Sequence, residues 1–121
     1  MENTYPRATP EIAARRRQLA PEVSDAFDTF SRLVFAEGAL SERTKQLVAV
    51  AVAHVTQCPY CIKSHTKTAR RKGSTAAEIM EAIWIAVEMR ASGAHSHSTL
   101  ALHALRFGHV EVTDDVKVAD H

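Results

Sequence analysis

Residues 47–65 read LVAVAVAHVTQCPYCIKSH, and this stretch indicates the fold and the chemistry more clearly than any other. Its first half spaces apolar residues as one face of a helix would, and we expect the stripe to be buried; it consists of Leu47, Val48, Ala51, Val52 and Val55. Its second half places Pro59 directly after a cysteine, and proline is tolerated in the first turn of a helix. The stretch therefore predicts two successive helices, with Cys58 at or next to the N-cap of the second.

Proline and capping residues divide the chain before this stretch. Residues 1–20 are expected to form an N-terminal arm, with a short polar helix over Glu11–Leu19. Pro21 opens the next predicted helix, which ends near Gly38 and whose apolar residues recur at helical spacing. Ser41 is then a candidate N-cap for the helix that precedes the cysteines.

The sequence after the cysteines predicts further helices. The cysteine helix is expected to run to about Arg71, and the Thr75-x-x-Glu78 pattern predicts a capping box for its successor. Residues 79–89 are apolar on nearly all sides, which is typical of a central helix or one at a subunit contact. A break or bend is expected at Gly93, before a last helix. Because no hairpin signal occurs, we predict an all-α single domain over residues 21–108 and a flexible C-terminal tail over 109–121.

Composition narrows the class of protein. The 121 residues are 45% hydrophobic and 24% charged, with a formal net charge of +1. Such a balance gives no reason to expect nucleic acid or an anionic membrane as a partner. No signal peptide and no apolar run of about 18 residues is found, so we predict a cytoplasmic protein. In that compartment a Cys-x-x-Cys pair favours catalysis or metal binding over a structural disulfide.

Three reactive side chains share one face of the predicted helix. At 100° per residue, Cys58, Cys61 and His65 point the same way. A helix N-terminus favours a thiolate, and an imidazole in register could take the thiol proton. The second thiol could then resolve a sulfenic acid on the first by closing a disulfide.

Two other interpretations of the pair stay open at this point. The cysteines could be inert and buried, because free cysteine packs as a small apolar group. They could also bind zinc together with His65, with His54, His95 or His97 as a fourth ligand. The spacing differs from the usual paired zinc knuckles, and the roles of His54, His95 and His97 are left undecided.

Beyond these residue patterns, the sequence resembles a known family. The segments LSERTKQL (40–47), QCPYCIKSH (57–65), TKTARRKG (66–73) and ASGAHSHS (91–98) resemble the carboxymuconolactone decarboxylase superfamily, in particular its AhpD-like alkylhydroperoxidase branch. The resemblance covers about residues 20–107. It implies an AhpD-like helical fold, a homo-oligomer such as a trimer or hexamer assembled through apolar helices, and no cofactor.

The resemblance also implies roles for individual residues. Cys61 would attack a hydroperoxide substrate, Cys58 would resolve and meet a dithiol or protein-thiol reductant, and His65 would belong to a proton relay. The relay glutamate of the family is replaced here by Gln46, which can orient His65 but cannot act as a base. Glu42, one turn earlier, is a candidate substitute. The alternatives are a non-peroxidatic redox partner or sensor and a zinc-binding oligomer module. Lactone decarboxylation is also known in the superfamily, but the enzymes that catalyse it do not rely on this cysteine pair.

Overall fold

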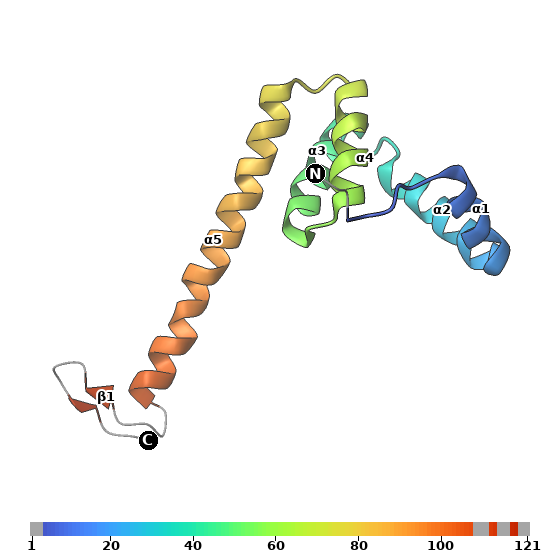
Figure 1. Cartoon of the computed structure of the whole chain (residues 1–121). Helices are drawn as coiled ribbons and strands as arrows, with labels where there is room; N and C mark the ends of the chain where they lie inside the picture. The colour runs from blue at the N-terminus through green and yellow to red at the C-terminus, as the bar shows by residue number, and fades with distance from the viewer. Residues whose placement is uncertain (1–3, 108–111, 114–116, 119–121) are drawn as a thin grey trace.

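The computed structural model describes residues 4–107, 112–113 and 117–118, and these are almost entirely helical. The helices are α1 (Pro10–Leu19), α2 (Pro21–Phe35), α3 (Glu42–Thr56), α4 (Pro59–Arg71) and α5 (Ala76–Phe107) (Figure 1). The predicted all-α class is confirmed. One minimal addition was not predicted: β1 (Val112–Thr113) pairs antiparallel with β2 (Lys117–Val118). The rest of the predicted tail lies outside the described residues.

The helix starts follow the predicted capping residues. Ser41 caps α3, where its hydroxyl accepts from the backbone N–H of Thr44 at 3.1 Å. Cys58 caps α4. The helix α2 begins at Pro21 as predicted but ends at Phe35, before Gly38, because Ala36 turns to an extended conformation with ψ 154°.

The helices α3, α4 and α5 pack together around a small core. Gln57 adopts the left-handed conformation, with φ +59°, and so turns the chain sharply from α3 into an antiparallel α4 (Figure 1). Val50, Ala69 and Ile79 from the three helices are buried against one another, with Leu47 and Ile83 packed around them. This core fixes α3 beside α4, and thereby the position of the residues between them.

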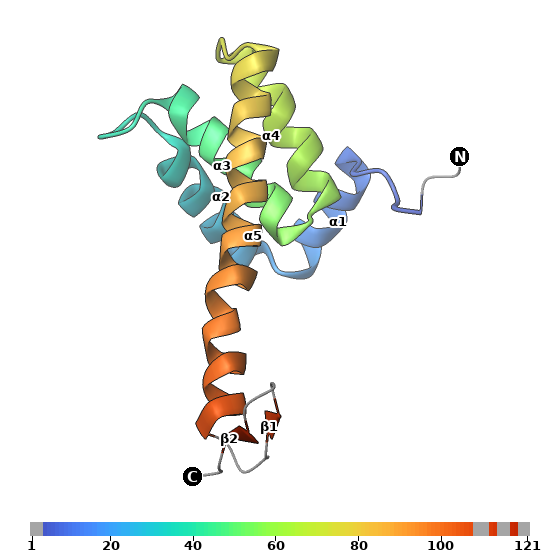
Figure 2. The same cartoon turned by 90° about the vertical axis from the view of Figure 1, so that its left-hand side faces the viewer.

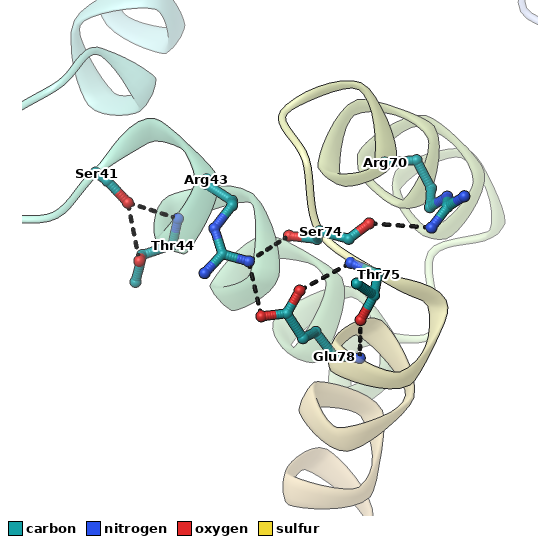
Figure 3. A network of polar contacts seen from close by, with 7 residues as sticks. All are labelled: Ser41, Arg43, Thr44, Arg70, Ser74, Thr75 and Glu78. Atoms are coloured by element: carbon teal, nitrogen blue, oxygen red, sulfur yellow. Dashed lines mark hydrogen bonds and ion pairs between the residues drawn. The ribbon is translucent and has the colours of Figure 1, made fainter.

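A polar network joins the start of α5 to the start of α3 (Figure 3). The predicted capping box is confirmed: Thr75 N–H donates to Glu78 Oε1 at 2.8 Å, and Glu78 N–H donates to Thr75 Oγ1 at 3.1 Å. Arg43 of α3 forms an ion pair with Glu78 at 2.9 Å. The hydrogen bond from the Thr75 backbone and the Arg43 guanidinium lower the pKa of the Glu78 carboxyl.

The helix α5 continues through Gly93, so the expected break there is absent and the two predicted helices are one. A glycine costs a helix only about 1 kcal/mol relative to alanine, which a helix of this length tolerates. The second half of α5 extends away from the other helices (Figures 1 and 2). Large apolar side chains are exposed along α5, among them Trp84 and Ile85 at 61% each, while Ile79 and Ala86 on another face are buried. No helix in the described part of the chain is long and apolar enough to cross a membrane.

The helices α1 and α2 form an antiparallel pair beside α3 and α4 (Figure 1). Thr9 caps α1 by accepting from the backbone N–H of Ile12, and Arg17 forms an ion pair with Asp25 at 2.6 Å. Lys45 of α3 holds the end of α2, because its Nζ donates to the backbone oxygens of Val34 at 2.8 Å and Ala36 at 2.6 Å. The last turn of α2 is thereby fixed against α3.

Candidate active site

The two cysteines meet at the start of α4. Their sulfurs lie 2.6 Å apart, and both cysteines are free thiols that are half-buried. Cys58 is the N-cap residue, and its Sγ accepts from the backbone N–H of Cys61 at 3.2 Å. The predicted position of Cys58 is confirmed, and the sulfurs are close enough to form a disulfide with little movement of the backbone.

Acidity is distributed unequally between the two thiols. Hydrogen bonds from the Cys61 thiol and the Cys61 backbone lower the pKa of Cys58. The hydrogen bond that Cys61 makes to Cys58, together with burial, raises the pKa of Cys61. When one of the two thiols ionises, the thiolate is therefore favoured on Cys58, where the helix N-terminus also stabilises it, and Cys61 keeps its hydrogen.

His65 is oriented by a buried glutamine. Gln46 of α3 is only 6% exposed, and its Oε1 lies 2.8 Å from His65 Nδ1. An amide oxygen can only accept, so Nδ1 carries the hydrogen, and in the neutral imidazole Nε2 is left with a free lone pair. Gln46 therefore lies where it can orient the His65 ring, with Nε2 as the nitrogen that can accept a proton.

An apolar pocket of about 440 Å³ opens beside these groups. Cys61 and His65 lie four residues apart on α4 and both line it, since such residues share a helix face. Phe35 forms part of the wall and stacks on the His65 ring, with centroids 5.1 Å apart and planes at 28°. The other walls include Val34 of α2 and Ala53 of α3. Val48 and Val52 also line the pocket, so these two members of the stripe predicted to be buried are about half exposed. Cys58 does not line this pocket.

The candidate substitute base lies apart from His65. Glu42 forms an ion pair with Lys72 at 2.8 Å and makes no hydrogen bond to His65 in the described chain. It lines a separate hollow together with Gln46 and Lys72. Glu42 thus neighbours the site without entering the pocket that contains Cys61.

His54 and His97 make contacts within their own helices. His54 Nδ1 lies 2.7 Å from the backbone oxygen of Val50, and His97 Nδ1 lies 2.8 Å from that of Gly93, one turn earlier in each helix. Among residues 4–107 no three His, Cys, Asp or Glu side chains converge as a metal site would require. The geometry of the described residues therefore does not support zinc binding at Cys58, Cys61 and His65.

Sequence patterns did not identify Phe35, Lys45 or the pocket walls as parts of the site. Phe35 comes from a helix that precedes the cysteines by more than twenty residues, and its contact with His65 arises only in the folded chain. A weak signal was present, because the last turn of α2 is apolar and Lys45 immediately precedes Gln46. Neither feature indicates a contact with His65 by itself.

Comparison with known proteins gives one family. The family model described as "Carboxymuconolactone decarboxylase family" matches residues 21–104. An uncharacterized protein from the cox locus of Paracoccus denitrificans is 55% identical over 102 residues, which are 84% of this chain and 91% of that protein. An uncharacterized protein of Cupriavidus necator is 29% identical over 85 residues, which are 70% of this chain and 75% of that protein.

Two crystal structures have the same fold. A protein from Methanobacterium thermoautotrophicum superposes with a TM-score of 0.67 at 33% identity, over 69% of this chain and 94% of its own. A carboxymuconolactone decarboxylase family protein from Legionella pneumophila superposes with a TM-score of 0.60 at 36% identity, over 63% of this chain and 68% of its own. The matched residues 21–104 contain every side chain that forms the site described above.

Proposed function

Because the chain belongs to the carboxymuconolactone decarboxylase family, we propose that it is a thiol-dependent hydroperoxide reductase that works through Cys58 and Cys61. Membership of this family is consistent with the resemblance of the sequence to its AhpD-like alkylhydroperoxidase branch. One observation carries the proposal: Cys61 and His65 line the same apolar pocket, and the Cys58 sulfur lies 2.6 Å from that of Cys61. A hydroperoxide with an apolar body would fill the pocket and bring its O–O bond to Cys61.

The first step is attack of Cys61 on the outer peroxide oxygen. Its raised pKa means that the Cys61 thiol needs a base, and Nε2 of His65 has the free lone pair to accept that proton. A bond forms between sulfur and oxygen, the O–O bond breaks, and His65 returns the proton to the leaving alkoxide. The products are an alcohol and a sulfenic acid on Cys61.

The second step closes the disulfide. Cys58 is already favoured as thiolate, and it attacks the Cys61 sulfenic sulfur, which releases hydroxide that becomes water on protonation. A dithiol or a protein thiol then reduces the disulfide by exchange, and its own thiols become the new disulfide. The unequal acidity thus suits two roles, with Cys61 directed to the pocket and Cys58 ready to resolve.

Gln46 serves this chemistry as an orienting group. Because His65 both receives and returns the proton, the cycle needs no carboxylate behind it, and Gln46 only has to hold Nδ1–H. Glu42, bound to Lys72, has no step in this cycle. We place the reaction in the cytoplasm, where cysteine pairs are kept reduced between turnovers.

Turnover of cysteine variants tests the proposal. In a peroxidase assay coupled to a dithiol reductant, Cys61→Ser should lose turnover completely, because serine forms no sulfenic acid. Cys58→Ser is the matched control: it should still consume about one equivalent of hydroperoxide per chain and then stop, because the resolving thiol is missing. A Cys61→Ser protein that turns over as fast as the parent would exclude the assigned role of Cys61.

A second candidate function is thiol–disulfide exchange without peroxide chemistry. It is favoured by the lowered pKa of Cys58 and by the position of that residue outside the pocket. Gln46→Glu separates the two, since it adds a carboxylate behind His65. A sharp gain in hydroperoxide turnover would mean that the natural Gln46 withholds a base and that exchange is the natural activity. Little change is expected if His65 works as described above.

Lactone decarboxylation, the activity in the family name, fits the pocket less well. Of the charged side chains that could meet a carboxylate substrate, the pocket presents only Lys45, and its Nζ is already bound to the carbonyls of Val34 and Ala36. The remaining wall is apolar apart from His65 and Thr56. Desolvating a carboxylate in such a pocket without a partner is costly.

We also propose that the chain functions as a homo-oligomer such as a trimer or hexamer. Large apolar side chains are exposed along α2 and α5, among them Phe27, Phe30, Trp84 and Ile85 at more than 60% each. An apolar surface this extensive is normally covered by a partner. Sedimentation at micromolar concentration that shows only monomer would exclude this proposal.

A further inference from the structure

Tyr60, the residue before Cys61, holds the N-terminal end of the described chain. Its hydroxyl donates to the backbone oxygen of Pro6 at 2.7 Å. The ring of Tyr5 meets that of Tyr60 edge-on, with centroids 5.9 Å apart and planes at 88°, which is a favourable aromatic geometry. Figures 1 and 2 show the segment that leads into α1, residues 4–9, near the start of α4.

The same N-terminal segment returns to α4 at a second point. Residues 5–35, which we call the N-terminal strap, run from the contact at Tyr60 through α1 and α2 to Phe35. Phe35 then stacks on His65. The strap is therefore anchored on α4 twice, and Cys61 lies between the two anchor positions in sequence.

From these two anchors we infer that Tyr60 is a positioning residue, which keeps the N-terminal strap closed beside the Cys61 pocket. Val34 and Phe35, the part of the pocket wall that comes from α2, belong to the strap. Their position therefore depends on the contacts of the strap with α4 as well as on the hydrogen bonds from Lys45 to the end of α2. Tyr60 does not line the pocket. Tyr60 affects a bulky apolar substrate indirectly, because it holds the strap and the strap supplies part of the wall against which the substrate packs. This effect on the substrate rests on the proposed function.

Amide hydrogen exchange tests the strap without any assumption about activity. Tyr60→Phe keeps the ring and removes the hydroxyl, which should increase the opening of the strap about fivefold. Tyr60→Ala also removes the ring contact and should increase opening about thirtyfold. We expect the amides of residues 21–35 to exchange faster by these factors, while residues 76–90 keep their rates. Lys63→Ala, an exposed change on the same helix, is the control and should change neither segment. Unchanged exchange over residues 21–35 in both Tyr60 variants would overturn the inference.

Kinetics with two peroxides tests the consequence for the pocket. For Tyr60→Phe we expect KM for cumene hydroperoxide to rise about fivefold with kcat unchanged, because substrate packing is weakened and the reacting groups are not. Hydrogen peroxide, which is too small to use the wall, should keep both constants. An equal change for the two peroxides, or a loss confined to kcat, would overturn the positioning role. A parent protein that reduces neither peroxide would refute the proposed function, and the exchange experiment would still decide on the strap.

Discussion

The hydrogen bond between Gln46 and His65 gives the sharpest quantitative prediction. Gln46→Leu keeps the approximate volume of a residue that is 6% exposed and removes the oxygen that accepts from Nδ1, 2.8 Å away. His65 then loses a hydrogen bond worth about 1–1.5 kcal/mol. That bond stabilised the tautomer with the hydrogen on Nδ1 and a free lone pair on Nε2, which is the active arrangement. That energy corresponds to about a five- to twelvefold smaller population of the active arrangement.

The expected result is a loss of about five- to twelvefold in the rate of hydroperoxide reduction, with KM nearly unchanged. Single-turnover kinetics under excess hydroperoxide measures the chemical step directly, and nitrogen NMR of the imidazole reports which ring nitrogen carries the hydrogen. Gln46→Asn, which keeps an amide on a shorter side chain, is the control for volume and polarity, and it should lose activity because its oxygen no longer reaches Nδ1. An unchanged rate in Gln46→Leu, together with an unchanged tautomer, would refute the reasoning.

Three further predictions follow from the same contacts. In Cys58→Ser the pKa of Cys61 should fall, because the hydrogen bond to the Cys58 sulfur that raises it is lost, and pH-dependent alkylation of Cys61 measures this; an unchanged or higher pKa would contradict the assigned distribution of acidity. Trp84→Glu places a charge on a side chain that is 61% exposed, and sedimentation should show smaller assemblies with unchanged helix content, whereas an unchanged assembly would place the subunit contact elsewhere. Glu78→Gln keeps the capping box and removes the charge beside Arg43, so its free energy of unfolding should be lower than that of the parent above pH 4.5. Because folding lowers the pKa of Glu78 from 4.5, this difference should shrink as the pH falls through the lowered value, and denaturant titrations at several pH values that show a constant difference would contradict the assignment.

Local signals in the sequence were sufficient to predict most of the helix boundaries. Ser41, Cys58 and the Thr75–Glu78 box act within one turn of their own helix, so their effect can be predicted from spacing alone. Gly93 was misjudged because its helical cost is small beside the length of α5, and a glycine signal cannot show how long a helix it lies in.

The candidate site was predictable only in part, because some of its contacts join residues that are far apart in the sequence. The proximity of Cys58, Cys61 and His65 follows from the helix period, and these residues share α4. The Phe35–His65 stack and the Tyr60–Pro6 hydrogen bond join segments that are 30 and 54 residues apart, and only the tertiary structure brings them together. The distribution of acidity also needed the structure, because it depends on the hydrogen bond between the two sulfurs and on which sulfur accepts the backbone N–H of Cys61.

The most direct test of the proposed chemistry is to identify the sulfur that receives the peroxide oxygen. The reduced Cys58→Ser protein is mixed with one equivalent of cumene hydroperoxide and a sulfenic acid trap, and the labelled peptide is identified by mass spectrometry, with the Cys61→Ser protein treated in parallel. We predict a stoichiometric adduct on Cys61 in the first protein and none on Cys58 in the second, although Cys58 is the more acidic thiol of the parent. An adduct on Cys58, or none on Cys61, would contradict the assignment of Cys61 as the peroxide-reactive thiol.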